Sequence, residues 1–314
     1  MNKIAFIFPG QGAQYVGMAK DFYEAFPIVR ETFEEASRIL STDFTRLILE
    51  GPEAELILTK NSQPAIFIVS VALLRCIQEQ FPHLQPAICA GLSLGEYTAL
   101  YASGRISFAD ALQIVAARGK YMQEACQEQQ GTMRVVLGLD PAIVAAHLPA
   151  GVWIANLNCP GQVVIAGVSS AMAQAEELLK AQGAKRVLPL DVSGAFHTPL
   201  MKSAQEKLKA SLLAVSLHES ATQLVMNVPG DFVDFSSEIR EHLIAQVASP
   251  TQWEKGIRLL EDVDLFVEIG PGKTLTGMNK KIGVKGQTLN IEKTTDLDTL
   301  RVQLESFYAA TPQR

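Results

Sequence analysis

Short apolar runs alternate with longer amphipathic segments along much of the chain. The short runs are bounded by glycine, proline or polar residues, a pattern typical of buried strands, and they occupy positions 3–8, 87–90, 223–228 and 264–269. The longer segments carry apolar residues at helical spacing and occupy 18–26, 28–40, 62–80, 108–124 and 251–260, with two further helices ending near 213 and 247. Strands that alternate with helices predict an α/β fold with a parallel sheet.

The pattern changes from position 131 onward. Strands are expected at 132–139, 152–157, 162–168 and 185–192, with helices at 141–148 and 170–182. The order β-α-β-β-α-β is that of a ferredoxin-like unit. Because this unit is closed at both ends, we predict a small ferredoxin-like domain at 129–193, inserted into a large α/β-hydrolase-like domain formed by 1–128 and 194–314. A ligand site is expected in the cleft between the two domains.

A sharp turn is predicted between the apolar run at 87–90 and a helical segment that starts at Glu96. Its sequence is GLSLG at 91–95, and strand, G-x-S-x-G, helix is the context of a nucleophile elbow. The backbone of Ser93 must be strained for its hydroxyl to stand clear of the sheet, and side chains at the two glycine positions would collide with the crossing strand and helix. An ordinary turn that uses the same small residues is the alternative.

A serine hydroxyl needs a neighbouring base, usually histidine, to act as a nucleophile. Among five histidines, His197 stands out, because it follows small residues, precedes Thr-Pro and begins a helix at the predicted domain junction. A helix N-terminus disfavours the protonated imidazole, which would keep His197 neutral. No acidic residue between Ser93 and His197 stands out as the third member of a triad. We therefore expect a dyad whose histidine is oriented by a backbone carbonyl.

Arg118 lies on the apolar face of the helix at 108–124, next to residues such as Val115. A guanidinium keeps its charge and is almost never buried without a partner. Two interpretations stay open at this point. Arg118 forms an ion pair with a buried carboxylate such as Glu96, or it receives an anionic group of a substrate held near Ser93.

Composition and charge exclude several classes of function. A net charge of −6 argues against a nucleic-acid-binding protein, which needs a basic surface to neutralise phosphates. No apolar stretch reaches the length of a membrane span, and the first residues are typical of a strand rather than a signal peptide. Glycine-rich stretches at 9–14 and 270–274 lack the spacing of nucleotide-binding loops. The four cysteines show no C-x-x-C spacing, so we expect buried thiols, no metal site and a cytoplasmic location.

Seven segments carry a resemblance to a known family. In order along nearly the whole chain they are FPGQGAQ (8–14), GLSLGEYTAL (91–100), RGKYMQEA (118–125), NLNCPGQVVIAG (156–167), SGAFHTPLM (193–201), SPTQW (249–253) and EIGPGKTLTGMNKKI (268–282). The chain resembles the malonyl-CoA:acyl-carrier-protein transacylases of dissociated fatty acid synthesis, which share their fold with polyketide acyltransferase domains.

The resemblance implies catalytic roles that agree with the reading of the residues alone. Ser93 is the expected nucleophile and His197 the expected general base. Gln11 and Leu94 are expected to donate their backbone N–H groups to an oxyanion hole.

The resemblance also implies the residues that bind or shape the substrate site. Arg118 is expected to hold the free carboxylate of malonate by a two-pronged contact, and Gln246 to lie near His197 and help orient it. Asn156 and Asn158 are expected to line the cleft. Phe196 resembles the bulky residue that disfavours branched acyl groups, so malonyl is expected to be preferred to methylmalonyl.

The implied reaction is a ping-pong transfer without a permanently bound cofactor, from malonyl-CoA to the phosphopantetheine thiol of an acyl carrier protein. Carrier proteins of this kind are acidic, so a local basic region must dock them. The most basic run consists of Lys273, Lys280, Lys281 and Lys285, for which a solvated surface is an equally good interpretation.

Other functions remain open. They are a discrete polyketide acyltransferase, a serine esterase or thioesterase, and a carrier-docking module without chemistry. Two positions depart from the family pattern: Leu92 stands where many members have histidine, and Arg134 stands where a small residue is expected.

Overall fold

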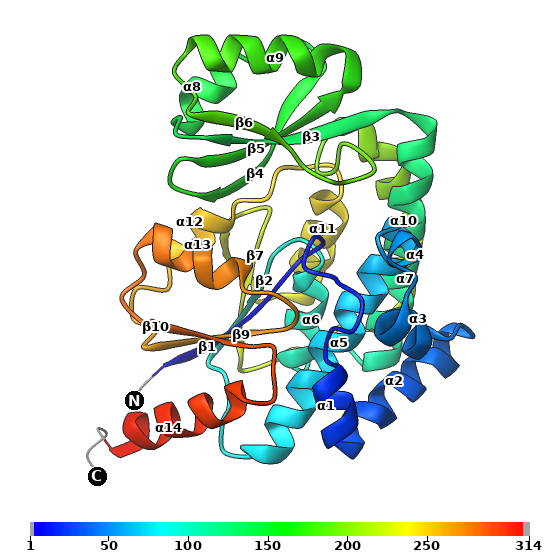
Figure 1. The fold of residues 1–314 in the computed structure, drawn as a ribbon, viewed down its shortest axis with the longest axis vertical. Coiled ribbons are helices and arrows are strands. Elements are labelled where there is room, and N and C mark those ends of the chain that lie inside the picture. The colour runs from blue at the N-terminus through cyan, green and yellow to red at the C-terminus, as the bar shows by residue number, and fades with distance from the viewer. Residues whose placement is uncertain (1–2, 310–314) are drawn as a thin grey trace.

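The structure, a computed structural model, describes residues 3–309 and has a large lower part and a smaller upper part (Figure 1). The lower part is built on a six-stranded sheet with the strand order β10-β9-β1-β2-β7-β8. Its strands are β1 (Ile4–Phe8), β2 (Ile88–Gly91), β7 (Gln223–Met226), β8 (Asp231–Phe232), β9 (Leu265–Ile269) and β10 (Gln287–Ile291). Neighbouring strands pair in parallel except for β7 and β8, which are antiparallel.

Helices cover both faces of this sheet, which is why β1 and β2 at its centre are apolar along their whole length. In β1, Phe6 and Phe8 belong to the core under one helical layer, whereas Ala5 and Ile7 belong to the core under the other. The first layer includes α1 (Lys20–Ala25), α2 (Pro27–Leu40), α3 (Phe44–Glu50), α4 (Glu53–Leu56), α5 (Thr59–Gln80), α6 (Gly95–Ala102), α7 (Phe108–Glu128), α10 (Lys202–Ala214), α11 (Ser236–Gln246) and α14 (Asp296–Ala309). The second includes α12 (Trp253–Arg258) and α13 (Thr274–Ile282).

The upper part is a four-stranded antiparallel sheet with the order β4-β5-β3-β6. Its elements are β3 (Gly131–Leu137), α8 (Pro141–Ala146), β4 (Val152–Cys159), β5 (Gln162–Val168), α9 (Ser169–Ala181) and β6 (Arg186–Pro189). Both helices lie on the outer face of the sheet (Figure 1). The predicted fold class is thereby confirmed, including the β-α-β-β-α-β order. The domain boundaries at 128/129 and 193/194 stay predictions.

The apolar pattern predicts none of α3, α4, β8, β10, α13 and α14. The first three are short, with 7, 4 and 2 residues respectively, so they leave little periodic signal. β10 is an edge strand in which only the last of 5 residues is buried, so it forms no apolar run. Two predicted helices begin later than expected, since those at 18–26 and 251–260 start at Lys20 and Trp253.

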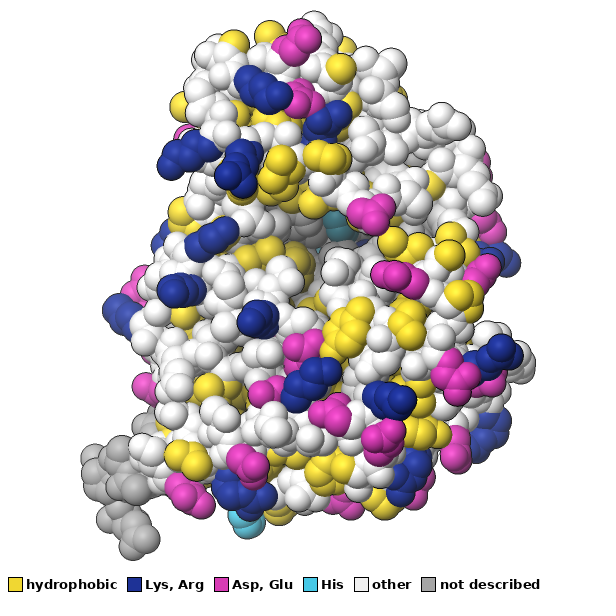
Figure 2. Space-filling view, viewed as in Figure 1, with side chains coloured by type: hydrophobic (Ala, Val, Ile, Leu, Met, Phe, Trp, Pro, Cys, Tyr) yellow, Lys and Arg dark blue, Asp and Glu magenta, His cyan; other side chains and the backbone are white. Residues whose placement is uncertain are grey.

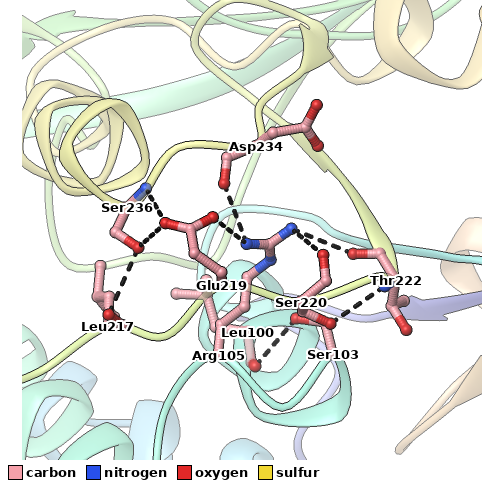
Figure 3. A network of polar contacts seen from close by, with 9 residues as sticks. All are labelled: Leu100, Ser103, Arg105, Leu217, Glu219, Ser220, Thr222, Asp234 and Ser236. Atoms are coloured by element: carbon pink, nitrogen blue, oxygen red, sulfur yellow. Dashed lines mark hydrogen bonds and ion pairs between the residues drawn. The ribbon is translucent and has the colours of Figure 1, made fainter.

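Arg105 joins the loop after α6 to the segment before β7 and to the segment after β8 (Figure 3). Its guanidinium is only 1% exposed and donates to the carbonyl oxygens of Asp234, Ser220 and Thr222 at 3.1, 3.4 and 3.2 Å. The carboxylate of Glu219 lies 3.9 Å away. Because β7 pairs with β2, the strand that leads into the Ser93 turn, Arg105 holds in place a strand that lies next to that turn.

Replacing Arg105 by methionine is expected to lower the free energy of unfolding by about 3 kcal/mol, because three part-buried carbonyl groups lose their charged donor. Denaturant unfolding measures this change. The control is Arg46→Met, which removes an exposed ion pair with Glu50 on a helix surface and is expected to cost at most about 0.5 kcal/mol. Equal stability of the two variants would contradict a structural role for Arg105.

Candidate active site

Ser93 occupies the tight turn between β2 and α6. Its φ is +52°, in the left-handed region that residues with a Cβ avoid. A Cβ placed on Gly91 would lie 2.0 Å from the carbonyl of Gly95, and one placed on Gly95 would lie 2.2 Å from the Phe8 carbonyl oxygen. The predicted elbow is therefore present, and the close approach of backbone segments explains both glycines.

His197 lies directly beside Ser93, and its Nε2 is 2.8 Å from the serine Oγ. Its Nδ1 is 2.8 Å from the backbone carbonyl oxygen of Gln246, and since a carbonyl only accepts, Nδ1 carries the proton. Nε2 is then the acceptor for the serine hydroxyl. Burial, and secondly the positive charge of Arg118, lower the pKa of His197 to about 4, so the imidazole is neutral near pH 7. The structure thus shows a serine–histidine pair oriented by a backbone carbonyl.

The guanidinium of Arg118 faces the same serine from α7. It is 1% exposed, and its Nη2 donates to Ser93 Oγ at 3.0 Å and to Gln246 Oε1 at 2.8 Å. Its Nη1 donates to Gln63 Oε1 at 2.7 Å, and burial lowers its pKa. The expected alternative of a direct ion pair with Glu96 is wrong, because the amide of Gln246 lies between the two charged groups.

Gln63 and Asn227 belong to the site although sequence reasoning did not identify them. The side-chain oxygen of Asn227 accepts the Ser93 backbone N–H at 2.6 Å, and its Nδ2 donates to the Gly91 carbonyl at 2.7 Å. Gln63 donates to Gln11 Oε1 at 3.3 Å, which connects the Arg118 contact to the loop after β1. Asn227 directly follows a strand that pairs with the elbow strand, and this position was the available signal.

A cleft of about 300 Å³ opens above these groups, lined by the small sheet on one side and by loops and helices of the lower part on the other. Figure 2 shows a hollow between the upper and lower parts, with Lys and Arg side chains gathered along one side of it. Among the lining residues are the predicted site residues Gln11, Ser93, Arg118, Asn156, Asn158, Phe196 and His197. The side chains of Leu94 and Gln246 are fully buried and do not line the cleft. Gln246 therefore contacts Ser93, His197 and Arg118 from beneath.

The two asparagines differ in their contacts. Asn156 donates its Nδ2 to Thr251 Oγ1 at 2.7 Å, whereas Asn158 has a buried side-chain oxygen without a hydrogen-bond partner. Of the two departures from the family pattern, Leu92 lines the cleft, and Arg134 forms an ion pair with Glu176 on α9. Arg134 therefore joins the small sheet to its helix.

Neither a cluster of metal-ligating side chains nor a membrane-spanning helix occurs between residues 3 and 309. In that range, no three His, Cys, Asp or Glu side chains are grouped to hold a metal ion. None of the helices there has the length and apolar character needed to cross a membrane. All four cysteines are buried as free thiols.

Comparisons with known proteins agree with this geometry. The family model described as "Acyl transferase domain" matches residues 5–306. The malonyl CoA-acyl carrier protein transacylase of Bacillus subtilis (strain 168) is 42% identical over 98% of both chains. The protein of the same name from Escherichia coli (strain K12) is 44% identical over 90% of this chain and 93% of its own.

Solved structures extend the agreement to three dimensions. The crystal structure of MCAT from Streptococcus pneumoniae has a TM-score of 0.90 and 41% identity, covering 96% of this chain and 100% of its own. A malonyl-transacylase in complex with a type II PKS acyl-carrier protein has a TM-score of 0.91 and 40% identity, covering 95% and 98%. The family expected from the sequence motifs is confirmed: the chain belongs to the acyl transferase family, among the malonyl CoA-acyl carrier protein transacylases.

Proposed function

We propose that this protein transfers the malonyl group of malonyl-CoA to the phosphopantetheine thiol of an acyl carrier protein in fatty acid biosynthesis. One observation carries the proposal: Ser93 Oγ lies 2.8 Å from a neutral imidazole and 3.0 Å from a buried guanidinium. A simple serine hydrolase does not need a buried cation beside its nucleophile. An enzyme that takes a diacid acyl group needs one to bind the free carboxylate. The names of the relatives point to the same reaction.

The first half-reaction makes an ester on Ser93. Its oxygen attacks the thioester carbonyl while its proton passes to His197 Nε2, and the carbonyl oxygen becomes an oxyanion. The backbone N–H groups of Gln11 and Leu94 are proposed to stabilise that oxyanion. The carbon–sulfur bond then breaks, and His197 returns the proton to the departing CoA thiolate.

The second half-reaction reverses these steps with a different thiol. The phosphopantetheine thiol gives its proton to His197 and attacks the malonyl ester, and Ser93 leaves with the proton from the imidazole. The acyl group arrives on CoA and leaves on the carrier, so no permanently bound cofactor is required. We place the protein in the cytoplasm, where reducing conditions keep its four thiols free.

Arg118 is proposed to bind the free carboxylate of malonate. Arg118 lines the cleft, and its guanidinium has five N–H groups, more than its three hydrogen bonds to Gln63, Ser93 and Gln246 use, so a carboxylate entering the cleft would find a donor. Phe196, 5% exposed in the cleft wall, is proposed to limit branching next to the thioester. Asn156 and Asn158 are proposed to line the path of the acyl group.

Intact-mass measurement tests the proposal in two stages. Mixing the protein with malonyl-CoA is expected to add one malonyl group, absent from the Ser93→Ala variant, and adding phosphopantetheinylated carrier protein is expected to move that group to the carrier. Release of free malonate with no malonyl carrier would identify a thioesterase. If Ser93 stays unmodified, the protein would be a carrier-docking module without chemistry.

The carrier is proposed to dock on the basic end of α13. Lys280 and Lys281 are exposed in its last turn, and Lys281 reaches Gln162 of the small sheet at 3.0 Å. Figure 2 shows Lys and Arg side chains on this side of the hollow. An acidic helix beside the cleft would meet these charges.

Reversing both charges, in Lys280→Glu/Lys281→Glu, is expected to raise the KM for the carrier by about tenfold and to leave malonylation of Ser93 by malonyl-CoA unchanged. Steady-state transfer and single-turnover acylation measure the two effects separately. The matched control is Lys20→Glu/Lys209→Glu, with the same net charge on exposed residues of α1 and α10. Equal losses in both half-reactions would contradict carrier docking at α13.

A further inference from the structure

A buried carboxylate lies beneath the elbow and has no role in the reaction described above. Glu96 stands in the first turn of α6, three positions after Ser93, and is 2% exposed. One of its oxygens accepts the backbone N–H of Asn227 at 2.5 Å, and the other accepts the side-chain N–H of Gln246. Both carboxylate oxygens therefore face N–H donors from other parts of the large domain.

The same two partners hold both backbone groups of the nucleophile. Asn227 Oδ1 accepts the Ser93 N–H at 2.6 Å, and Gln246 Nε2 donates to the Ser93 carbonyl at 2.9 Å. Ser93 has a φ of +52°, which needs support from its surroundings. Glu96 is therefore linked to the backbone of Ser93 by two routes. Asn227 connects it to the Ser93 N–H group, and Gln246 connects it to the Ser93 carbonyl.

Gln246 extends the network to the other two groups of the site. Its backbone carbonyl accepts His197 Nδ1–H at 2.8 Å, and its Oε1 accepts Arg118 Nη2 at 2.8 Å. An amide has one accepting and one donating end. With the Glu96 carboxylate holding the NH₂ end, the oxygen must face Arg118. If the amide were turned the other way, its NH₂ group would face the Arg118 guanidinium, a donor against a donor. Its oxygen would face the Ser93 carbonyl, an acceptor against an acceptor.

We infer that Glu96 is a positioning residue whose carboxylate, through Asn227 and Gln246, fixes the backbone of Ser93 and the amide that orients Arg118. It supplies the acid missing from a serine–histidine–acid triad, but acts on the nucleophile's backbone rather than on the imidazole. Burial raises the pKa of Glu96 to about 8, and its N–H donors and the charge of Arg118 oppose that rise. Because each carboxylate oxygen accepts an N–H group, the arrangement is that of the ionised form. The inference rests on the proposed function only for the identity of the acyl group.

A fluorophosphonate ester tests the inference without malonyl-CoA, because it reports the reactivity of Ser93 alone. The serine oxygen bonds to phosphorus, fluoride leaves, and the proton passes to His197. Glu96→Gln is nearly isosteric but presents an NH₂ group to one of two donors. We expect its labelling rate to fall by about 100-fold, the scale of a small misplacement of reacting groups.

Glu268→Gln is the matched control. Glu268 is also fully buried, and it accepts N–H groups of Leu275 and Thr276 without touching Ser93, His197 or Arg118. Both variants lose a buried carboxylate, so a general loss of stability would appear in both melting temperatures. A labelling rate of Glu96→Gln within about threefold of the control would overturn the inference.

Glu96→Asp supplies the rescue, because it keeps the charge one methylene further from the two donors. We expect a labelling rate between those of the parent and Glu96→Gln. A Glu96→Asp rate equal to that of the parent, or no faster than that of Glu96→Gln, would overturn the inference. If Glu96→Gln does not fold, the comparison of Glu96→Asp with the parent decides the case. If the parent protein reacts normally with the fluorophosphonate but takes up no malonyl group, the proposed function is wrong. The inference about Glu96 would not be affected.

Discussion

Replacing Arg118 by alanine is expected to slow malonylation of Ser93 on the order of ten-thousandfold at low malonyl-CoA, and acetylation by acetyl-CoA only about tenfold. Two charge-assisted hydrogen bonds to the malonate carboxylate contribute together about 4 kcal/mol, and the variant loses both. Acetyl carries no carboxylate, so it loses only the contact between the guanidinium and Ser93 Oγ, which is 3.0 Å long. The selectivity between the two acyl groups, measured by intact mass over time, therefore separates substrate binding from serine activation.

The control for this prediction keeps the charge and removes the planar fork. Arg118→Lys is expected to malonylate faster than the alanine variant and more slowly than the parent, because an ammonium cannot make the two-pronged contact. Melting temperatures of both variants must be compared, since Gln63 and Gln246 lose a donor in each. Unchanged malonylation by Arg118→Ala would show that this cation does not hold the substrate.

Ser93, His197 and Arg118 could be predicted because each carries a local signal in the chain. The two glycines of the elbow leave room for backbone, and that requirement is visible within five residues. A guanidinium on the apolar face of a helix is conspicuous without any knowledge of the fold. For the same reason the small sheet was predictable, since its strands and helices follow one another in the chain.

The supporting residues could not be predicted in this way. Asn227 and Glu96 meet across 131 positions, and Gln246 and Glu96 across 150, so their hydrogen bonds depend on which strands and helices become neighbours. The sequence alone indicates Glu96 only as a direct partner of Arg118, an arrangement that the intervening amide excludes. A buried polar residue is chosen by its three-dimensional partners, and periodicity carries no information about them.

His197→Ala is expected to slow acylation of Ser93 by at least about a thousandfold, because no other base lies within reach of the hydroxyl in the structure between residues 3 and 309. It is also expected to change how stability depends on pH. The pKa of His197 is about 4 in the folded protein, below its ordinary value of 6.5, because burial disfavours the charged imidazole.

Below pH 6.5 the unfolded chain takes up a proton at His197, whereas the folded protein does so only near pH 4. Acidification therefore favours unfolding through this residue, and a stabilisation of about 3 kcal/mol, complete above pH 6.5, is lost as pH falls to 4. The alanine variant has no such group. Subtracting its unfolding free energies from those of the parent at each pH cancels every other titration, including that of Glu96. A difference that stays constant between pH 7 and 4 would mean that the imidazole is not held neutral, and the base in the proposed mechanism would have to be sought elsewhere.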